Sequence, residues 1–198
     1  MRLFAALELN AKVISNMTEL VRRLRPTASV QWVHPRNMHV SLKYIGEWPA
    51  RRLDSVISSL NQVRLSTPLT VPLAGLGFFP NAESPRVFWA GAENTTALRR
   101  LASQVDAVLQ PLGVTPEVRP YHPHLTLGRI SGDEDLSELH HAVDDLPSRD
   151  FGAISPDRFL LFESTLTPNG AIYRKVAEFP FLTQAAPASA ASELAASV

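Results

Sequence analysis

Two copies of one short pattern supply the residues of this chain that could do chemistry. The pattern is a histidine, an aliphatic residue, a hydroxyl residue and a leucine, and it occurs at His39–Leu42 and again at His124–Leu127. Both copies lie in runs of β-favouring residues, and a strand places side chains two residues apart on the same face. The sequence therefore predicts two strands that each present an imidazole and a hydroxyl to one side.

Such a pair of strands suits a reaction at a phosphoryl centre. Imidazole titrates near neutrality, so one histidine can accept a proton from water while a second, protonated histidine donates one to the leaving oxygen. The hydroxyls of Ser41 and Thr126 can donate hydrogen bonds to non-bridging phosphate oxygens. A single pattern of this length is more often a packing feature or a local hydrogen bond. The prediction depends on the repeat.

The two motifs and their flanks, Asn37–Glu47 and Arg119–Arg129, resemble those of the 2H phosphoesterases. Within that superfamily the chain is similar to the RNA 2',3'-cyclic phosphodiesterases, historically called 2'-5' RNA ligases. The similarity extends from Arg2 to Phe181 and includes Trp89-Ala90-Gly91 between the motifs. It implies an α+β, bilobal fold, with two pseudo-symmetric lobes of antiparallel sheet and outer helices around a central cleft.

The resemblance also implies an activity and a set of site residues. The activity is metal-independent hydrolysis of RNA 2',3'-cyclic phosphodiester ends to 2'-phosphomonoesters, with no cofactor. The implied catalytic residues are His39 as proton donor and His124 as proton acceptor, and the implied phosphate-binding residues are Ser41, Thr126 and Arg129. Ser41 departs from the commoner threonine. By strand parity Arg129 faces away from His124 unless the strand bulges at Gly128, so its role rests on the resemblance.

Two features leave alternatives open. Lys43 shares a strand face with His39 and Ser41 by parity and could offer its charge to a phosphate, although an exposed strand lysine more often only keeps the edge soluble. Phe78 and Phe79 lie in a stretch rich in glycine and proline that we interpret as a loop. Their rings could stack on an RNA base or could cap the core.

Other functional classes fit the sequence less well. His34, His122 and His124 could bind a metal, but the chain has no cysteine and no carboxylate at ligand spacing beside the motifs. A non-catalytic nucleotide- or RNA-binding module would need the cleft but not both histidines. A nucleophilic Ser41 or Thr126 lacks the usual strand-to-helix elbow and an orienting acid. The reverse reaction, 2'-5' RNA end joining, uses the same groups, and water favours hydrolysis.

Composition sets the remaining expectations. The 198 residues are 45% hydrophobic, with 19 basic and 19 acidic residues, so no overall field draws nucleic acid to the protein and RNA contact must be local. The expected partners are RNA ends or nucleotides that bear a 2',3'-cyclic phosphate. Without a signal segment or an apolar run of spanning length, we expect a cytoplasmic protein with no membrane association. We also expect a monomer with no obligate protein partner.

The periodicity predicts elements in an α+β order. Apolar residues recur at helical spacing in residues 10–25, 51–63, 95–112 and 136–146, and the last segment carries His140 and His141, which we expect to face solvent. Strands are predicted at residues 2–9, 30–33, 38–45, 69–76, 87–92, 124–130, 159–162 and 172–179. Residues 1–183 form the expected single bilobal domain, and the Ala/Ser/Pro-rich residues 184–198 are expected to be a disordered tail.

Overall fold

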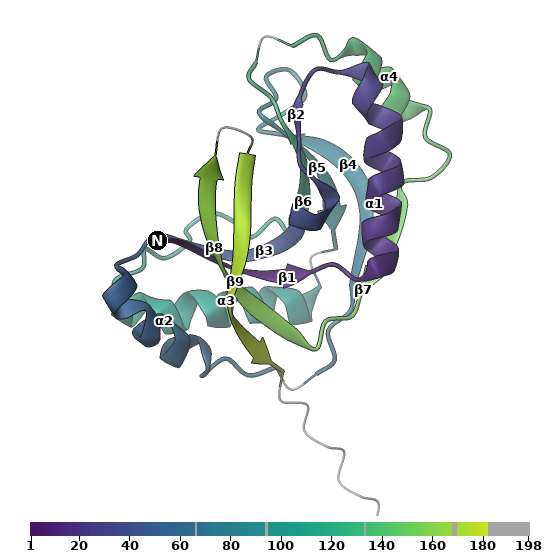
Figure 1. Cartoon of the computed structure of the whole chain (residues 1–198). Coiled ribbons are helices and arrows are strands. Elements are labelled where there is room, and N and C mark those ends of the chain that lie inside the picture. Colours follow the sequence, from purple (N-terminus) through teal and green to yellow (C-terminus); the bar gives the residue numbers. More distant parts are fainter. Residues whose placement is uncertain (66, 94, 133, 168–169, 182–198) are drawn as a thin grey trace, which may run out of the picture.

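The fold is built on two antiparallel sheets. The computed structural model describes residues 1–181 except 66, 94, 133 and 168–169. The first sheet has strand order β3-β1-β8-β9 and the second has order β2-β6-β5-β4-β7 (Figure 1). The strands are β1 (Arg2–Glu8), β2 (Gln31–Trp32), β3 (His39–Glu47), β4 (Val71–Phe79), β5 (Val87–Ala92), β6 (His124–Arg129), β7 (Asp150–Ile154), β8 (Arg158–Thr167) and β9 (Gly170–Pro180). The predicted α+β fold with two antiparallel sheets is confirmed.

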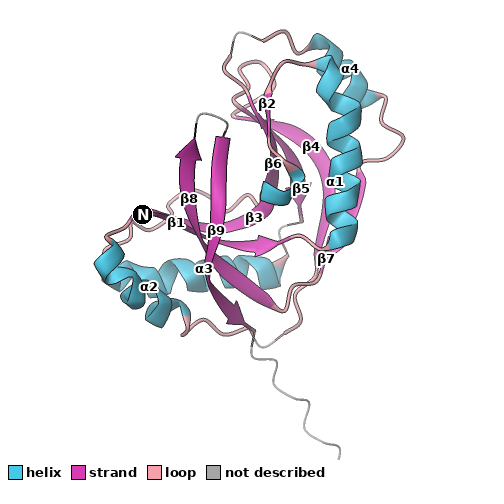
Figure 2. Ribbon diagram, viewed as in Figure 1, coloured by secondary structure: helices cyan, strands magenta, loops and turns pink. Residues whose placement is uncertain are grey.

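Each sheet has its own pair of helices (Figure 2). Helices α1 (Ala11–Leu24) and α4 (Ser137–Asp144) lie with the second sheet, and α2 (Leu53–Leu60) and α3 (Thr96–Leu109) lie with the first. The longest helices follow from sequence as expected. In α1, Asn10 caps the N-terminus by accepting a hydrogen bond from the Val13 amide at 2.9 Å, and the buried stripe includes Met17 and Leu24.

The chain passes between the two lobes several times, because consecutive elements often belong to different sheets. One connected cluster of buried apolar residues therefore runs through both lobes, from Leu3 and Leu7 in the first sheet to Phe88 and Leu125 in the second. Among the described residues, no helix is long and apolar enough to cross a membrane. The predicted tail at 184–198 lies outside the described residues.

The stretch expected to be a loop around Phe78 and Phe79 is instead the end of β4, so that prediction is wrong. Gly77 pairs with Trp89 of β5, and Phe78 pairs with Phe88. A side chain at Gly77 would overlap the Trp89 ring, so the glycine that suggested a loop provides space for a neighbouring aromatic residue. The edge strand β7 was not predicted, because three of its five residues, Asp150, the positive-φ Gly152 and Ala153, are poor strand formers. It forms through pairing with β4.

The two histidines of α4 differ from each other. His141 is exposed, as expected. His140 was expected to face solvent, and this is wrong: its ring packs edge-on against Phe78 at 4.9 Å, and its Nε2 is buried. Phe78 in turn stacks on Phe88 at 4.9 Å. Phe78 is thus partly buried and packs against the core, as expected in the alternative in which its ring caps the core.

Candidate active site

The two motif strands approach each other although they belong to different sheets. Their polar side chains line one cavity of about 210 Å³. All five residues singled out in the sequence border it: His39, Ser41, His124, Thr126 and Arg129. The segment before β3 contributes His34, and β9 contributes Tyr173. The fold therefore brings together the full predicted set.

A β-bulge in the first motif strand changes the position of Lys43. Ala6 of β1 pairs with Ser41, but the next residue back, Ala5, pairs with Lys43, so Leu42 is an extra residue on β3. After the bulge the alternation of faces is reversed. Lys43 turns into the protein, where its side chain is 7% exposed. The expectation that Lys43 shares the face of His39 and Ser41 is wrong for this reason.

The second motif strand has a bulge at the corresponding place. Trp89 of β5 pairs with Thr126 and Phe88 pairs with Gly128, which makes Leu127 the extra residue. The reversal returns Arg129 to the face of His124, where it borders the same cavity. The bulge lies at Leu127, one residue before the position that the sequence suggested. In both motifs the extra residue stands three positions after the histidine. Tyr44 in the first motif therefore corresponds to Arg129 in the second.

Each catalytic candidate is oriented by a carbonyl two residues before it. Nδ1 of His39 is 2.8 Å from the Asn37 oxygen, and Nδ1 of His124 is 2.8 Å from the His122 oxygen. A carbonyl can only accept, so Nδ1 must carry the hydrogen in both rings. Nε2 is then the nitrogen that gains or loses a proton. The two imidazoles are matched in tautomer and can exchange protons with a group between them.

Aromatic rings surround His39. Its ring centroid lies 4.7 Å from that of Phe4, 5.3 Å from Tyr173 and 6.3 Å from Phe162. Burial among these rings lowers the pKa of His39 to about 4, against the raising effect of the hydrogen bond to Asn37. The nearby positive charges of His124 and Arg129 lower it further. His39 is therefore neutral at pH 7 when the cavity holds no anion.

His124 is packed less tightly. Phe79 meets its ring edge-on with centroids 5.0 Å apart, and the Trp89 centroid lies at 6.5 Å. Burial lowers the pKa of His124 from its ordinary value, the hydrogen bond to His122 opposes this, and the charges of His122 and Arg129 add to the lowering. Phe79 lies beside His124, and stacking of its ring on an RNA base stays a prediction.

A second, larger groove adjoins the first cavity. It has a volume of about 620 Å³ and shares Ser41 and His124 with the smaller cavity. Its walls include three aromatic residues: Tyr44, Phe79 and Tyr121. Tyr44 is 55% exposed. Sequence reasoning missed Tyr44 and Tyr121, although aligning the two motifs would have matched Tyr44 with Arg129.

The geometry also bears on a metal site. His34, one of the candidate ligands, accepts a hydrogen bond from the Arg36 amide through Nδ1 at 3.2 Å. Within the described parts of the chain, no group of three or more His, Cys, Asp or Glu side chains could hold a metal ion. The cavity instead offers imidazole, hydroxyl and guanidinium groups, which suit an anionic phosphate.

Comparisons with known proteins identify the family of the chain. Residues 14–153 match the model of the 2'-5' RNA ligase superfamily. The chain is 32% identical over 183 residues to an RNA 2',3'-cyclic phosphodiesterase of Thermotoga maritima, covering 91% of this chain and 96% of the relative. It is 32% identical over 179 residues to a protein of the same name from Archaeoglobus fulgidus, covering 90% of this chain and 99% of the relative.

Solved structures support the same assignment. A Thermus thermophilus structure superposes with a TM-score of 0.77 at 28% identity, covering 93% of this chain and 100% of the other. An Escherichia coli LigT structure solved with 3'-AMP superposes with a TM-score of 0.76, covering 92% of this chain and 98% of the other. Its sequence identity is 22%, so this match supports the fold alone. Together with the two motifs in one cavity, these matches show that the chain belongs to the 2'-5' RNA ligase superfamily, among the 2H phosphoesterases.

Proposed function

We propose that this protein is an RNA 2',3'-cyclic phosphodiesterase that opens the cyclic phosphate to a 2'-phosphomonoester without a metal ion. The observation that supports this best is the pair of imidazoles, His39 and His124, that border one cavity with the same tautomer and with a hydroxyl beside each. The names of the relatives agree with the proposal.

In the proposed reaction, a water oxygen attacks phosphorus on the side opposite the ribose 3' oxygen. Nε2 of His124 takes the proton of that water as the new P–O bond forms. The bond from phosphorus to the 3' oxygen breaks, and that oxygen takes a proton from Nε2 of His39. The 2' oxygen stays bonded to phosphorus. The next turnover requires only that the proton passes from His124 back to His39 through solvent.

The phosphate would lie in the smaller cavity. The hydroxyls of Ser41 and Thr126 donate to its non-bridging oxygens, and Arg129 offsets the charge that develops on them. The bound anion also acts on the histidines. Its negative charge raises the pKa of His39 from about 4 and opposes the effects of burial and of Arg129, which lets His39 hold a proton when substrate is present.

The nucleoside would lie in the larger groove. Aromatic rings stack on bases of any sequence, and Tyr44, Phe79 and Tyr121 border this groove next to Ser41 and His124. A local site of this kind suits an RNA end or a free nucleotide. The chain has no net positive charge, so it is not suited to binding a long duplex. We propose a cytoplasmic monomer, with residues 1–183 as one functional domain.

The direct test is to incubate the purified protein with adenosine 2',3'-cyclic phosphate and to identify the product by phosphorus NMR. The expected product is adenosine 2'-monophosphate. A preparation of the His39→Ala/His124→Ala variant serves as the control for contaminating nucleases. Formation of the 3'-monophosphate, or binding without hydrolysis, would contradict the proposal, and the second result would favour a binding module.

A further inference from the structure

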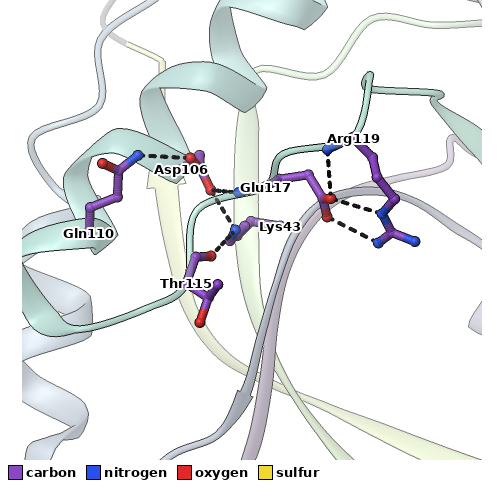
Figure 3. Close-up of polar contacts among 6 residues, drawn as sticks. All are labelled: Lys43, Asp106, Gln110, Thr115, Glu117 and Arg119. Carbon is purple, nitrogen blue, oxygen red and sulfur yellow. Dashed lines mark hydrogen bonds and ion pairs between the residues drawn. The ribbon is translucent and has the colours of Figure 1, made fainter.

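An ion pair between the buried Lys43 and the partly buried Asp106 joins the first motif strand to helix α3. Nζ of Lys43 lies 2.5 Å from Oδ1 of Asp106 and donates a hydrogen bond of 2.7 Å to the Thr115 carbonyl (Figure 3). In the part of the chain that the structure describes, Lys43 is the one charged or polar residue this deeply buried. A buried ammonium is costly without close partners, and these two contacts offset the cost of burying Lys43.

The Asp106 carboxylate uses both of its oxygens. Oδ1 also accepts from the Glu117 amide at 3.2 Å, and Oδ2 accepts from Nε2 of Gln110 at 2.9 Å (Figure 3). Burial would raise the pKa of Asp106, but the hydrogen bonds from Lys43, Gln110 and Glu117 outweigh it and lower the pKa. Asp106 is therefore ionised at neutral pH, and the pair is a full ion pair.

The network holds a particular segment, residues 113–123, which runs from α3 in the first lobe to β6 in the second. Residues 114–123 form no helix or strand. Two hydrogen bonds of opposite direction tie this segment to β3. Lys43 donates to the carbonyl of Thr115, and the Tyr121 hydroxyl donates to the carbonyl of Ser41 at 2.8 Å. The segment is thus fastened to the strand that carries His39.

The same segment orients the other histidine. It leads directly into His124, the first residue of β6, and the carbonyl that accepts from Nδ1 of His124 belongs to His122, within the segment. A shift of the segment would move this carbonyl and turn the imidazole with it. The chain of contacts therefore runs from Lys43 and Asp106 on the first lobe to the ring of His124 on the second.

We infer that Lys43 and Asp106 are positioning residues, which fix the orientation of His124 relative to His39 by holding residues 113–123 against β3. The inference rests on the proposed function, in which the two imidazoles act on one phosphate. It assigns Lys43 a role without phosphate contact, because its ammonium is already paired inside the protein. Displacing a reacting group by about 1 Å can cost about a hundredfold in rate.

The test uses the double variant Lys43→Met/Asp106→Leu. Each single change leaves a charge buried without its partner and can unfold the protein, whereas replacing both residues with apolar side chains of similar volume often preserves the fold. The matched control is Arg158→Met/Glu178→Leu, which removes an ion pair of 2.7 Å whose two side chains are each 45% exposed, on β8 and β9 of the same lobe.

We expect the double variant to fold, and its kcat for adenosine 2',3'-cyclic phosphate to fall about tenfold to a hundredfold, with KM changed less than about threefold. The control variant keeps the wild-type kcat. Nitrogen NMR of the imidazoles supplies a readout that does not depend on activity. In wild type both rings hold the proton on Nδ1, and in the double variant His124 becomes a mixture of tautomers while His39 does not change.

A second background tests whether the effect passes through His124. In the His124→Ala variant, the same two substitutions should lower the residual rate by less than about threefold, because no imidazole remains to be misplaced. An equal loss in both backgrounds would overturn the inference. A KM that rises about tenfold with kcat unchanged would also overturn it, since that result identifies Lys43 as a substrate-binding group.

Tyr121→Phe keeps the inference testable if the double variant does not fold. This variant removes the hydroxyl that donates to Ser41 and should lower kcat and change the His124 tautomer in the same direction. Wild-type kcat and nitrogen shifts in Tyr121→Phe would show that attachment of residues 113–123 to β3 does not orient His124, and this would overturn the inference. If the wild-type protein does not hydrolyse the cyclic phosphate, the proposed function fails, and the nitrogen shifts of the variants still decide whether the network orients His124.

Discussion

The imidazole of His39 lies against the phenyl ring of Phe4, with the ring centroids 4.7 Å apart and 31° between the ring planes. Phe4 is itself buried, and the Phe162 ring stacks on it with the ring centroids 5.2 Å apart. The cost of placing a charged imidazole in this surrounding is what lowers the pKa of His39 to about 4. Both stability and catalysis should therefore depend on pH in ways that can be measured.

Stability should decrease as the pH falls from about 6.5 to about 4. The folded pKa of His39 is about 4 and its ordinary value is 6.5, so in this range the unfolded chain binds a proton that the folded protein does not. The stabilisation is complete above about pH 6.5 and is lost on acidification. Between about pH 7 and pH 5 we expect His39 to account for a loss of about 2 kcal/mol.

Urea unfolding at both pH values measures this loss. His39→Gln, whose side chain does not titrate, should lose about 2 kcal/mol less than the wild type over the same interval. His141→Gln, at an exposed position on α4, serves as the control and should behave as wild type. An equal acid loss in the wild type and His39→Gln would show that the folded protein does not disfavour protonation of His39.

The dependence of kcat/KM on pH should be bell-shaped, with its maximum on the acid side of neutrality. This ratio reports the ionisation of the free enzyme, in which the pKa of His39 is about 4 and that of His124 is lowered from 6.5. The active form of the enzyme carries one proton on the two histidines together. The acid limb and the basic limb of the kcat/KM profile should therefore both have midpoints below about pH 6.5. The kcat profile should be shifted to higher pH, because bound phosphate favours the protonated rings. A kcat/KM limb above about pH 7.5 would contradict this description.

The two residues that correspond between the motifs should have different kinetic effects. Arg129→Met removes a charge from the cavity that would hold the phosphate, and we expect kcat/KM to fall about tenfold to a thousandfold, mainly through kcat. Tyr44→Ser should instead raise KM about threefold to tenfold and leave kcat unchanged, because stacking on a base is the same in the ground state and the transition state. Steady-state kinetics with adenosine 2',3'-cyclic phosphate distinguish the two.

Arg51→Met removes an exposed arginine outside both cavities and is the control for a change in net charge. It should have wild-type constants. If Tyr44→Ser lowers kcat without an effect on KM, the larger groove does not hold the nucleoside.

Much of the fold could be predicted from the sequence, because the information is local. The stripe Val13, Met17, Leu20, Val21, Leu24 and the cap at Asn10 define α1, and both motif strands follow from their β-favouring residues. The histidines and hydroxyls were found because they are two residues apart and precede the bulges.

What could not be predicted depends on pairing between strands. The position of Lys43 is reversed by the extra residue Leu42, and that bulge exists only in the register between β3 and β1. Arg129 depends on the same kind of feature in β6. His140 turns inward because its ring packs against Phe78, which belongs to a strand far away in the sequence. Parity and periodicity describe one segment at a time and contain none of these relationships.

Activity should not depend on a divalent ion. The prediction follows from the two-histidine mechanism, in which proton transfers replace a metal-activated water. Protein dialysed against EDTA should keep its kcat within about twofold, and added zinc or magnesium should not increase it. Loss of activity in the chelator, with recovery on addition of one metal, would require a mechanism based on metal-bound water.

The opposite roles of His39 and His124 are the central claim, and a change of leaving group tests them most directly. Replacing either histidine with alanine should lower turnover of the ordinary cyclic phosphate about a hundredfold to ten-thousandfold, with the fold confirmed by the thermal melting curve. A substrate whose 3' oxygen is replaced by sulfur has a leaving group that needs little protonation, since a thiol has a pKa of about 8.5.

The measurement is the rate of each alanine variant with this sulfur-substituted substrate. We expect His39→Ala to recover most of the wild-type rate and His124→Ala to recover almost none, because only the proton donor has become unnecessary. Recovery of His124→Ala instead would show that the acid and the base are exchanged, and equal behaviour of the two variants would contradict a mechanism with one histidine on each side of the phosphate.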